Sequence, residues 1–371
     1  MQATQRALDE LGTARPVLAL AFVSQEFSTV EVLNGLVGLL GDTPIWGFST
    51  IRPITDEGDE ARSVVVALLT GNELRAQIQW WPNYSQDSVG TARQIAQSLR
   101  HETFMSHDAL FVADGINCSL VPFCQAIESI PIGMNGCMAA GEQALGKTYQ
   151  IGKNQSGPGS LSIALLGGRF RVGVGAAHGW RSVGAFFRAT RTRDIWLQSL
   201  DGAPAVDSYV RYFGHSPREW AAPPLTDMTR LYPLGVETEA GSANLMVRSA
   251  LRVEIDGSLR MSAPVPEGAV VHLMIGDPAA CLEAAKSAAR TALAGLKKAR
   301  PLLAVAMVDA AWGYLFETHP SHVAAALKEV LGDLPLVGAY TLGQITRPSE
   351  KEPLQIHNQN LALLILGEAT D

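Results

Sequence analysis

The sequence predicts an α/β fold in two lobes of mixed sheets, built from repeated strand–helix–strand–loop–strand units with antiparallel β-rich insertions. The first observation is a repeat: GDTPIWGFSTIRPIT at 41–55 shares seven residues with GDLPLVGAYTLGQIT at 332–346. The second is that short apolar runs of strand length alternate with helical patterns, as in sheets buried beneath helices. The third is a central stretch of alternating apolar and polar residues, which indicates antiparallel strands.

Length and composition narrow the class of protein. A chain of 371 residues favours two domains. A net charge of −7, without a block of basic residues, argues against nucleic acid and anionic membranes as partners. No apolar run reaches the ~18 residues that span a bilayer, and the four cysteines show no CxxC spacing. We therefore expect a soluble, cytoplasmic protein.

The first and last units are the most alike. The apolar runs 14–23 and 299–308 agree at seven of ten positions and predict buried strands. A helix should follow each, at 28–41 and 320–333, with Ser28 and Ser321 as N-caps and Gly41 and Gly332 at the C-termini. Each helix leads to a second strand, a glycine loop and a closing strand, predicted at 44–48 and 335–339 and at 63–69 and 361–366.

A weaker copy lies between them. Its first strand, helix, second strand with glycine loop, and closing strand are predicted at 109–114, 119–127, 131–136 and 160–166. Three such units indicate duplication with pseudo-symmetry.

The middle of the chain is rich in β-structure. Antiparallel strands are expected within 170–180, 182–191 and 250–261, the last with an Asp256-Gly257 hairpin turn. The proline-rich segment 215–227 is the linker candidate, so the predicted domains are 15–214 and 215–371. A long alanine-rich helix is predicted at roughly 278–299.

The glycine loops are the candidate ligand site, because ligands of α/β sheets bind where loops leave the carboxyl ends of strands. If the units are pseudo-symmetric, the loops of the first and last units line one cleft. The alternative is that these glycines only make tight turns. The candidate ligand-binding residues are Ser49, Thr50, Arg52, Asn135, Cys137, Tyr340, Thr341 and Gln344.

The stretch GEQALGKT at 141–148 matches the phosphate-loop pattern of nucleotide-binding proteins. That loop works only when a strand leads into the first glycine and a helix begins at the lysine. Here Gly152, Gly157 and Pro158 follow closely, so residues 147–152 should be extended or irregular. Nucleotide binding by 141–148, or an enzyme with Cys137 as nucleophile, is kept as an alternative.

His178 is the histidine whose surroundings favour a ligand. Its neighbours are small, as in GVGAAHGW, which leaves room for a planar group, and Trp180 can supply an apolar wall. For His272 and for the pair His319 and His322, a hydrogen-bonded structural role is expected. No zinc motif occurs.

In order along the chain, these stretches resemble the FIST (F-box and intracellular signal transduction) sensory family, with its N-terminal and C-terminal halves. The match runs from about residue 15 to the end. The stretches are GFSTIRPIT, FVADG, GMNGCMAAGEQALGKTYQI, AAHGW, LDGAPAVDSY, VRSALRVEIDGSL, VPEGAVVHLM, LPLVGAYTLGQI and HNQNLALLIL. The chain departs from the family at LLAVAMVD, which lacks the usual cysteine, at Gln344, and at Arg52-Pro53.

The resemblance implies a ligand-sensing module of bacterial signal transduction and no enzyme, with small molecules such as amino acids as proposed ligands. One branch of stand-alone members binds haem, senses nitric oxide and signals to a partner histidine kinase, as in a two-component system. We therefore expect a small ligand and a sensor histidine kinase or other signalling protein as partners, haem as the candidate cofactor with His178 as its metal ligand, and a homodimer as a candidate assembly. A ligand-free scaffold is the remaining alternative.

Overall fold

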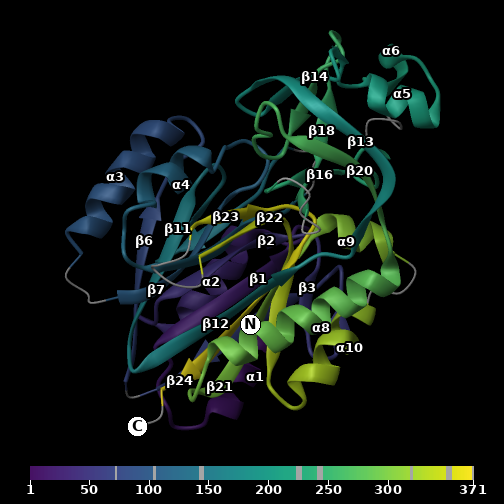
Figure 1. Ribbon diagram of the computed structural model, residues 1–371. Helices are drawn as coiled ribbons and strands as arrows, with labels where there is room; N and C mark the ends of the chain where they lie inside the picture. The colour runs from purple at the N-terminus through teal and green to yellow at the C-terminus, as the bar shows by residue number, and fades with distance from the viewer. Residues whose placement is uncertain are drawn as a thin grey trace.

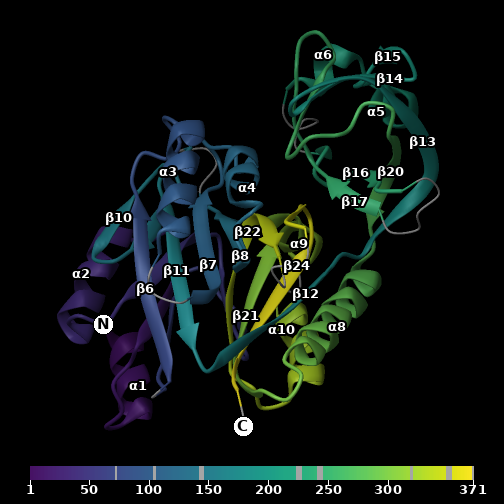
Figure 2. The same cartoon turned by 60° about the vertical axis from the view of Figure 1, so that its left-hand side comes forward.

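The computed structural model describes residues 1–71, 73–102, 106–141, 146–222, 228–239, 245–317, 321–347 and 353–369. It has two lobes: a larger α/β lobe and a β-rich lobe, labelled β13 to β20 at the top of Figure 1. Figure 2 shows that the chain passes between the lobes from β12 to β13 and from β20 to α8. The predicted α/β class, with mixed sheets and an antiparallel insertion, is confirmed.

The three predicted units are present in the α/β lobe. In each, the first strand pairs in parallel with the second strand and antiparallel with the closing strand. The first unit is β1 (Leu18–Ser24), α2 (Thr29–Leu40), β2 (Ile45–Thr50) and β5 (Val64–Leu69). The second is β7 (Ser106–Asp114), α4 (Val121–Ile127), β8 (Gly133–Ala139) and β11 (Leu161–Gly168). The third is β21 (Arg300–Asp309), α10 (His322–Leu331), β22 (Leu336–Thr346) and β24 (Leu361–Glu368).

A glycine recurs in the second strand of all three units, and the same structural reason requires it in each. Gly47, Gly136 and Gly338 lie in the second strand, each opposite a residue of the first strand. A Cβ atom on these glycines would lie 2.0, 2.1 and 2.1 Å from the facing carbonyl oxygen. Only glycine permits so close an approach of two backbones. The glycine loops predicted in the second and third units are therefore wrong, because β8 and β22 continue past the glycine. In the first unit β2 ends at Thr50 and a bend at 51–52 follows, so a loop is present there.

Most helix ends agree with the prediction. The Ser28 hydroxyl accepts a hydrogen bond from the Glu31 amide, and Gly41 and Gly332 end their helices with φ of 58° and 62°. These backbone conformations favour glycine. Ser321 occupies the N-cap position of α10 but makes no capping hydrogen bond with its side chain.

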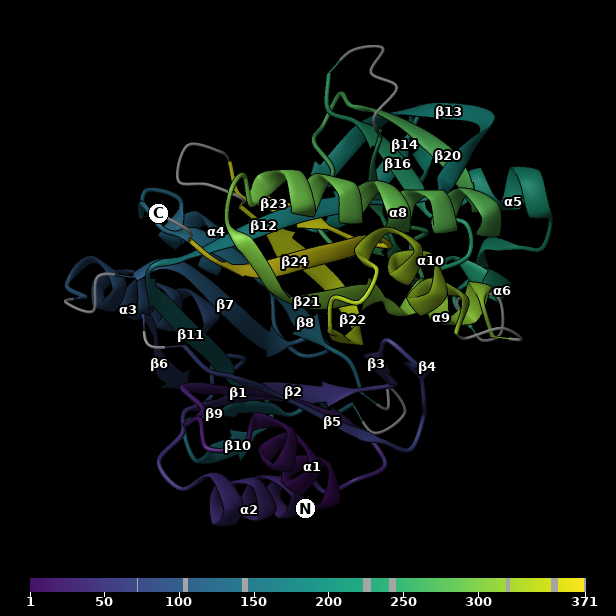
Figure 3. The same cartoon turned by 90° about the horizontal axis from the view of Figure 1, so that it is seen from below.

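Two sheets stack between layers of helices. Figure 3 shows α1 (Gln2–Leu11) and α2 outside the small sheet of the first unit, and α8 (Pro278–Gly295) and α10 outside the central sheet. The small sheet has the order β10-β9-β2-β1-β5, with β9 at Gln150–Gly152 and β10 at Gln155–Gly157. Leucine, valine and phenylalanine side chains fill the space between the sheets. On the outer face of the central sheet, α3 (Ser88–Arg100) and α4 cover one end, and α8 and α10 cover the other.

Strand β22 joins all three units. It pairs in parallel with β21; at Val337–Ala339 it pairs with β3 (Pro53–Thr55), and at Thr341–Ile345 with β8. The central sheet has the order β12-β24-β21-β22-β8-β7-β11-β6, and β23 pairs with β22. Its remaining strands are β4 (Gly58–Asp59), β6 (Leu74–Trp81), β12 (Phe170–Ala177) and β23 (Gln355–His357).

The β lobe has its own core around Trp220, Tyr209 and Leu259. Gly257 has a φ of 81° in the predicted hairpin turn, which is confirmed. The strands are β13 (Trp180–Arg193), β14 (Trp196–Leu200), β15 (Ala203–Pro204), β16 (Leu234–Glu237), β17 (Leu245–Arg248), β18 (Ala250–Val253), β19 (Leu259–Met261) and β20 (Val270–Gly276). The short helices α5 (Asp207–Phe213) and α6 (Pro217–Trp220) complete it.

We expect Gly338→Ala to lower the free energy of unfolding by about 1–3 kcal/mol, because the new methyl group would meet the Ala306 carbonyl. Gly38→Ala is the control: Gly38 is exposed in α2 with no atom near its absent Cβ, and alanine there should add about 0.5–1 kcal/mol. Urea denaturation measures both. Equal effects of the two substitutions would contradict the close-approach explanation.

Candidate functional site

The predicted ligand residues of the first and last units do lie close together. They form a packed contact between the small and central sheets, here called the seam. The Thr50 hydroxyl donates to the Tyr340 carbonyl at 2.7 Å, and the Tyr340 amide donates to the Arg52 carbonyl at 3.1 Å. The Ser49 hydroxyl donates to the Ala140 carbonyl at 3.0 Å. Ser49, Thr50 and Tyr340 are buried, so these contacts connect the sheets.

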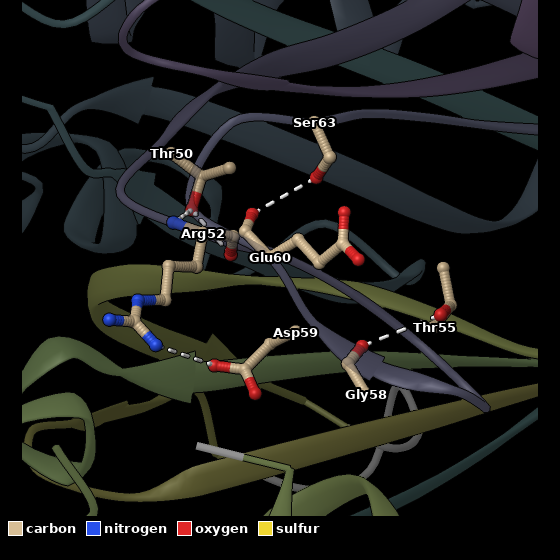
Figure 4. A network of polar contacts seen from close by, with 7 residues as sticks. All are labelled: Thr50, Arg52, Thr55, Gly58, Asp59, Glu60 and Ser63. Atoms are coloured by element: carbon tan, nitrogen blue, oxygen red, sulfur yellow. Dashed lines mark hydrogen bonds and ion pairs between the residues drawn. The ribbon is translucent and has the colours of Figure 1, made fainter. Parts of the chain in front are cut away.

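Figure 4 shows the polar network at this seam. Arg52 Nη1 lies 3.7 Å from Asp59 Oδ2, and the Asp59 side chain is only 2 % exposed. Burial raises the pKa of Asp59, and the nearby Arg52 opposes that shift. Thr55 and Ser63 donate to the carbonyls of Gly58 and Glu60, which holds the turns around β4.

The other predicted residues are also inside the protein. The Thr341 hydroxyl accepts a hydrogen bond from the side-chain nitrogen of Gln344 at 2.7 Å, and the Asn135 side-chain oxygen accepts one from the backbone amide of Arg347. Cys137 is completely buried in β8, and burial raises the pKa of its thiol well above the usual value. This position is unsuited to a nucleophile.

A cavity of about 510 Å³ lies instead beyond the carboxyl ends of β7 and β21, under the β lobe. Met138 and Leu342 line it. Each directly follows a predicted residue, Cys137 or Thr341, and successive side chains of a strand point to opposite faces. The polar residues of its lining include Arg230, Ser249, Arg252, Arg260, Ser262, Asp309, Asn358 and Gln359.

Three arginines, Arg230, Arg252 and Arg260, line this cavity together with the acidic Asp309. Arg252 and Arg260 face one another across β18 and β19, an arrangement of like charges that destabilises a sheet. Arg252 is paired with Glu254. The buried Nε of Arg260 has no hydrogen-bond partner in the described part of the chain. An acceptor in the cavity would satisfy it.

Two buried side-chain amide oxygens at this cavity need a hydrogen-bond donor, whereas Arg260 needs an acceptor. Asn358 and Gln359 are 2 % and 1 % exposed, and Asn358 Oδ1 and Gln359 Oε1 have no donor among the described residues. The Gln359 side-chain nitrogen donates to the Arg230 carbonyl at 2.7 Å and to Ser249 Oγ at 2.8 Å. This fixes the amide orientation and leaves its oxygen as an acceptor.

Gln359 also connects the lobes through its backbone. Its carbonyl accepts from Trp180 Nε1 and Trp312 Nε1, both at 2.8 Å, and its amide donates to Asp309 Oδ2 at 2.8 Å. Asp309 also caps α9 (Ala310–Leu315) by accepting from the Ala311 amide. Burial raises the pKa of Asp309 to about 6. These hydrogen bonds hold the backbone of Gln359 and the carboxyl group of Asp309 in place at the floor of the cavity.

The surroundings of His178 do not fit haem. One ring nitrogen, Nε2, lies 2.9 Å from the Leu245 carbonyl, and the other, Nδ1, accepts from the Trp180 amide at 3.2 Å. Helix α8 fills the space beside the neighbouring glycines, since a Cβ on Gly175 or Gly179 would meet its backbone at 2.0 or 2.1 Å. Trp180 is buried. The room inferred from small residues is occupied by this helix, so His178 and Trp180 are corrected to structural residues here.

His357 is a second half-buried imidazole near His178. Its Nε2 lies 2.8 Å from Thr346 Oγ1. Burial, with the nearby Arg248 and His178, lowers the pKa of His357 to about 4. Arg248, itself buried, donates to the Val247 and Ile356 carbonyls.

This environment predicts a pH dependence. The pKa of His357 is lower in the folded than in the unfolded protein, so its stabilising contribution is present above about pH 6.5 and is lost as pH falls through 4. Relative to His357→Gln, the wild type should lose about 1–3 kcal/mol over that range. Urea denaturation at several pH values checks this, and parallel curves for the two proteins would refute it.

The remaining sequence expectations concern the phosphate-loop pattern, metals and membranes. Residues 147–149 are irregular and 150–152 form β9, as predicted, so no helix begins at Lys147; residues 142–145 lie outside the described part, as does His319. In the described ranges, no three His, Cys, Asp or Glu residues gather as a metal site. None of the described helices has the length and apolar character needed to cross a membrane.

Comparisons with known proteins identify the family. A family model described as FIST N domain matches residues 17–203, and one described as FIST C domain matches 205–347. Among curated proteins, none matches the chain.

Three solved structures are weakly similar. A chorismatase has 9 % identity and a TM-score of 0.34 over 96 % of this chain and 95 % of its own. Phosphoribosylformylglycinamidine synthase II of Thermotoga maritima has 6 % identity and a TM-score of 0.24, over 80 % and 72 %. PurLQS of the same organism has 8 % identity and a TM-score of 0.18, over 96 % and 66 %. Scores this low support no conclusion about function.

Proposed function

The chain belongs to the FIST family, whose domains are sensory domains of signal transduction that bind small ligands, and we propose that its ligand binds in the cavity under the β lobe. The observation that carries this proposal is the unmatched polar chemistry of the cavity. Arg260 Nε lacks an acceptor, and the side-chain oxygens of Asn358 and Gln359 lack donors, among the described residues. Buried polar groups are normally hydrogen-bonded.

The same chemistry specifies the ligand class. Arginines bind carboxylates through charge-assisted hydrogen bonds, and neutral amide oxygens accept from an ammonium group. A small zwitterion with both groups, as in an amino acid, satisfies both sides of the cavity. The volume of about 510 Å³ lies within the usual range of small-molecule sites, ~300–1,000 Å³.

Sensing, without catalysis, is part of this proposal. The ligand would contact Arg252 and Arg260 of the β lobe and Asn358 and Gln359 of the α/β lobe. A ligand that touches both lobes favours the arrangement in which they are closed. A partner protein, such as a sensor histidine kinase, would then read that arrangement, as the family resemblance suggests.

A ligand panel tests the proposal. Thermal unfolding and titration calorimetry should be measured with each L-amino acid, its deaminated carboxylic acid and its decarboxylated amine. We expect at least one amino acid to raise the melting temperature, because a ligand that binds only the folded state stabilises it. Its two truncated analogues should bind about 10–100-fold more weakly, since each leaves buried groups unpaired.

The contrary outcomes are equally clear. If no zwitterion binds, or if a truncated analogue binds as tightly as the parent, the proposed ligand class is wrong. A Soret band after haem addition, unchanged in His178→Ala, would support haem as the cofactor and place it at another residue.

A further inference from the structure

Strand β5 is an unprotected edge of the small sheet. It pairs with β1 on one side, and no strand in the described ranges pairs with its other side. The Ser24 amide donates to the Ser63 carbonyl, and antiparallel backbone groups alternate in direction. Val64, Val66 and Leu68 therefore turn their N–H and C=O groups toward the open side.

The composition of β5 makes this edge unusual. Proteins normally protect edge strands with charged residues, proline, bulges or short length. The opposite edge of the same sheet, β10, has three residues, and the β6 edge of the central sheet carries Arg75, Gln77 and Gln79. Strand β5 reads VVVALL, with no polar residue and no bulge. Such an edge is suited to pairing with another strand.

A groove of about 680 Å³ runs along this edge. Its walls include Val65, Leu69, Leu302 and Leu336, and its rim carries three acidic residues, Glu10, Asp56 and Asp333. No lysine, arginine or histidine lines it among the described residues. Asp56 lies 4.0 Å from Lys328, while Glu10 and Asp333 are exposed at the rim.

We propose that this groove binds an extended segment of a partner protein, in which apolar residues alternate with lysine or arginine. The segment adds a strand to β5 through backbone hydrogen bonds, its apolar side chains fill the groove, and its basic side chains face the acidic rim. A second copy of this chain is disfavoured, because two acidic rims would meet. The surface is separate from the ligand cavity and does not depend on the ligand proposal.

Fluorescence anisotropy with the full chain tests this surface. The probe is a fluorescein-labelled peptide of alternating lysine and valine, seven residues long. We expect saturable binding that weakens with salt. The same peptide with N-methylated valines should bind about tenfold more weakly, because N-methylation removes backbone donors worth about 1 kcal/mol each. A glutamate–valine peptide should not bind.

Two variants locate the binding. Val66→Pro removes an outward N–H without breaking a ladder bond to β1, and Val66→Thr is its control with that N–H intact. If Val66→Pro unfolds the sheet, Glu10→Lys with Asp333→Lys serves instead, and should weaken binding about tenfold by losing two exposed ion pairs. If the peptide binds Val66→Pro, or the double variant Glu10→Lys with Asp333→Lys, as tightly as the wild type, the proposal is wrong. A dimer, seen by light scattering, that Val66→Pro abolishes would also overturn it, since the occupant would then be a second copy.

Discussion

Arg347→Met should lower the free energy of unfolding by about 3–5 kcal/mol, a large fraction of the total stability of a typical domain. Arg347 is 1 % exposed. Its guanidinium donates to carbonyls at the end of α4 and just after it, those of Ile127, Glu128, Ile130 and Ile132. Methionine fills the volume but leaves these buried acceptors unpaired, and an unpaired buried acceptor costs about 1–3 kcal/mol.

Urea denaturation of the wild type and three variants separates the loss of these hydrogen bonds from a loss of packing. Arg347→Lys keeps a cation with three donors and should lie between the wild type and Arg347→Met. Arg93→Met, at an exposed arginine of α3, should change stability by less than about 0.5 kcal/mol. If methionine and lysine at 347 are equally harmful, the carbonyl contacts are not the reason for the loss.

Arg260→Met should weaken binding of the zwitterionic ligand about 10–100-fold, because it removes a charge-assisted hydrogen bond in a buried site. In the absence of ligand, the same variant should be more stable than the wild type by about 0.2–1 kcal/mol, since the opposed Arg252 loses a like charge across the strands. Weaker binding with greater stability distinguishes a ligand contact from a structural residue.

Calorimetry and urea denaturation of the same preparations measure both quantities. The control is Arg191→Met, on the exposed surface of β13, which should change neither. A variant at position 260 that loses both stability and binding would show that Arg260 supports the fold of the β lobe and only indirectly the site.

The repeat predicted much of the α/β lobe. The shared spacing in 41–55 and 332–346 predicted a strand that contains a glycine in each copy, although the first copy breaks after Thr50 into β2 and β3 while β22 continues to Thr346. The strands and helices of all three units followed from apolar runs and caps. The sequence did not show why Gly47 and Gly338 must be glycine. Glycine usually indicates a turn, whereas here it allows a carbonyl group of the neighbouring strand to approach closely.

The candidate site was harder to predict. The prediction named Cys137 and Thr341, but the residues that line the cavity are their neighbours Met138 and Leu342. The expected loops are strands, so successive side chains point to opposite faces and the prediction missed by one residue. Asn358 and Gln359 belong to a stretch that carried the family resemblance, but their unpaired oxygens appear only in three dimensions. The pairing of Arg252 with Arg260 could have been predicted from the sequence. The Asp256-Gly257 turn fixes the register of the hairpin and so places the two arginines opposite one another.

The His178 prediction failed for a physical reason. Small residues around an imidazole leave room either for a ligand or for another part of the chain, and composition does not distinguish these. Helix α8 takes that room, with Ala288 and Ala292 against Gly175 and Gly173.

The pairing of β22 with both β3 and β8 also sets the order of folding. During synthesis, residues 53–55 and 136–139 leave the ribosome long before residues 336–346 exist. Until then the first two units have strand edges without their final partner, and contacts across nearly 300 residues form slowly. We expect the nascent chain to depend on chaperones over this interval. Once β22 is in place, the three units should unfold together, in one transition, despite their origin as repeats.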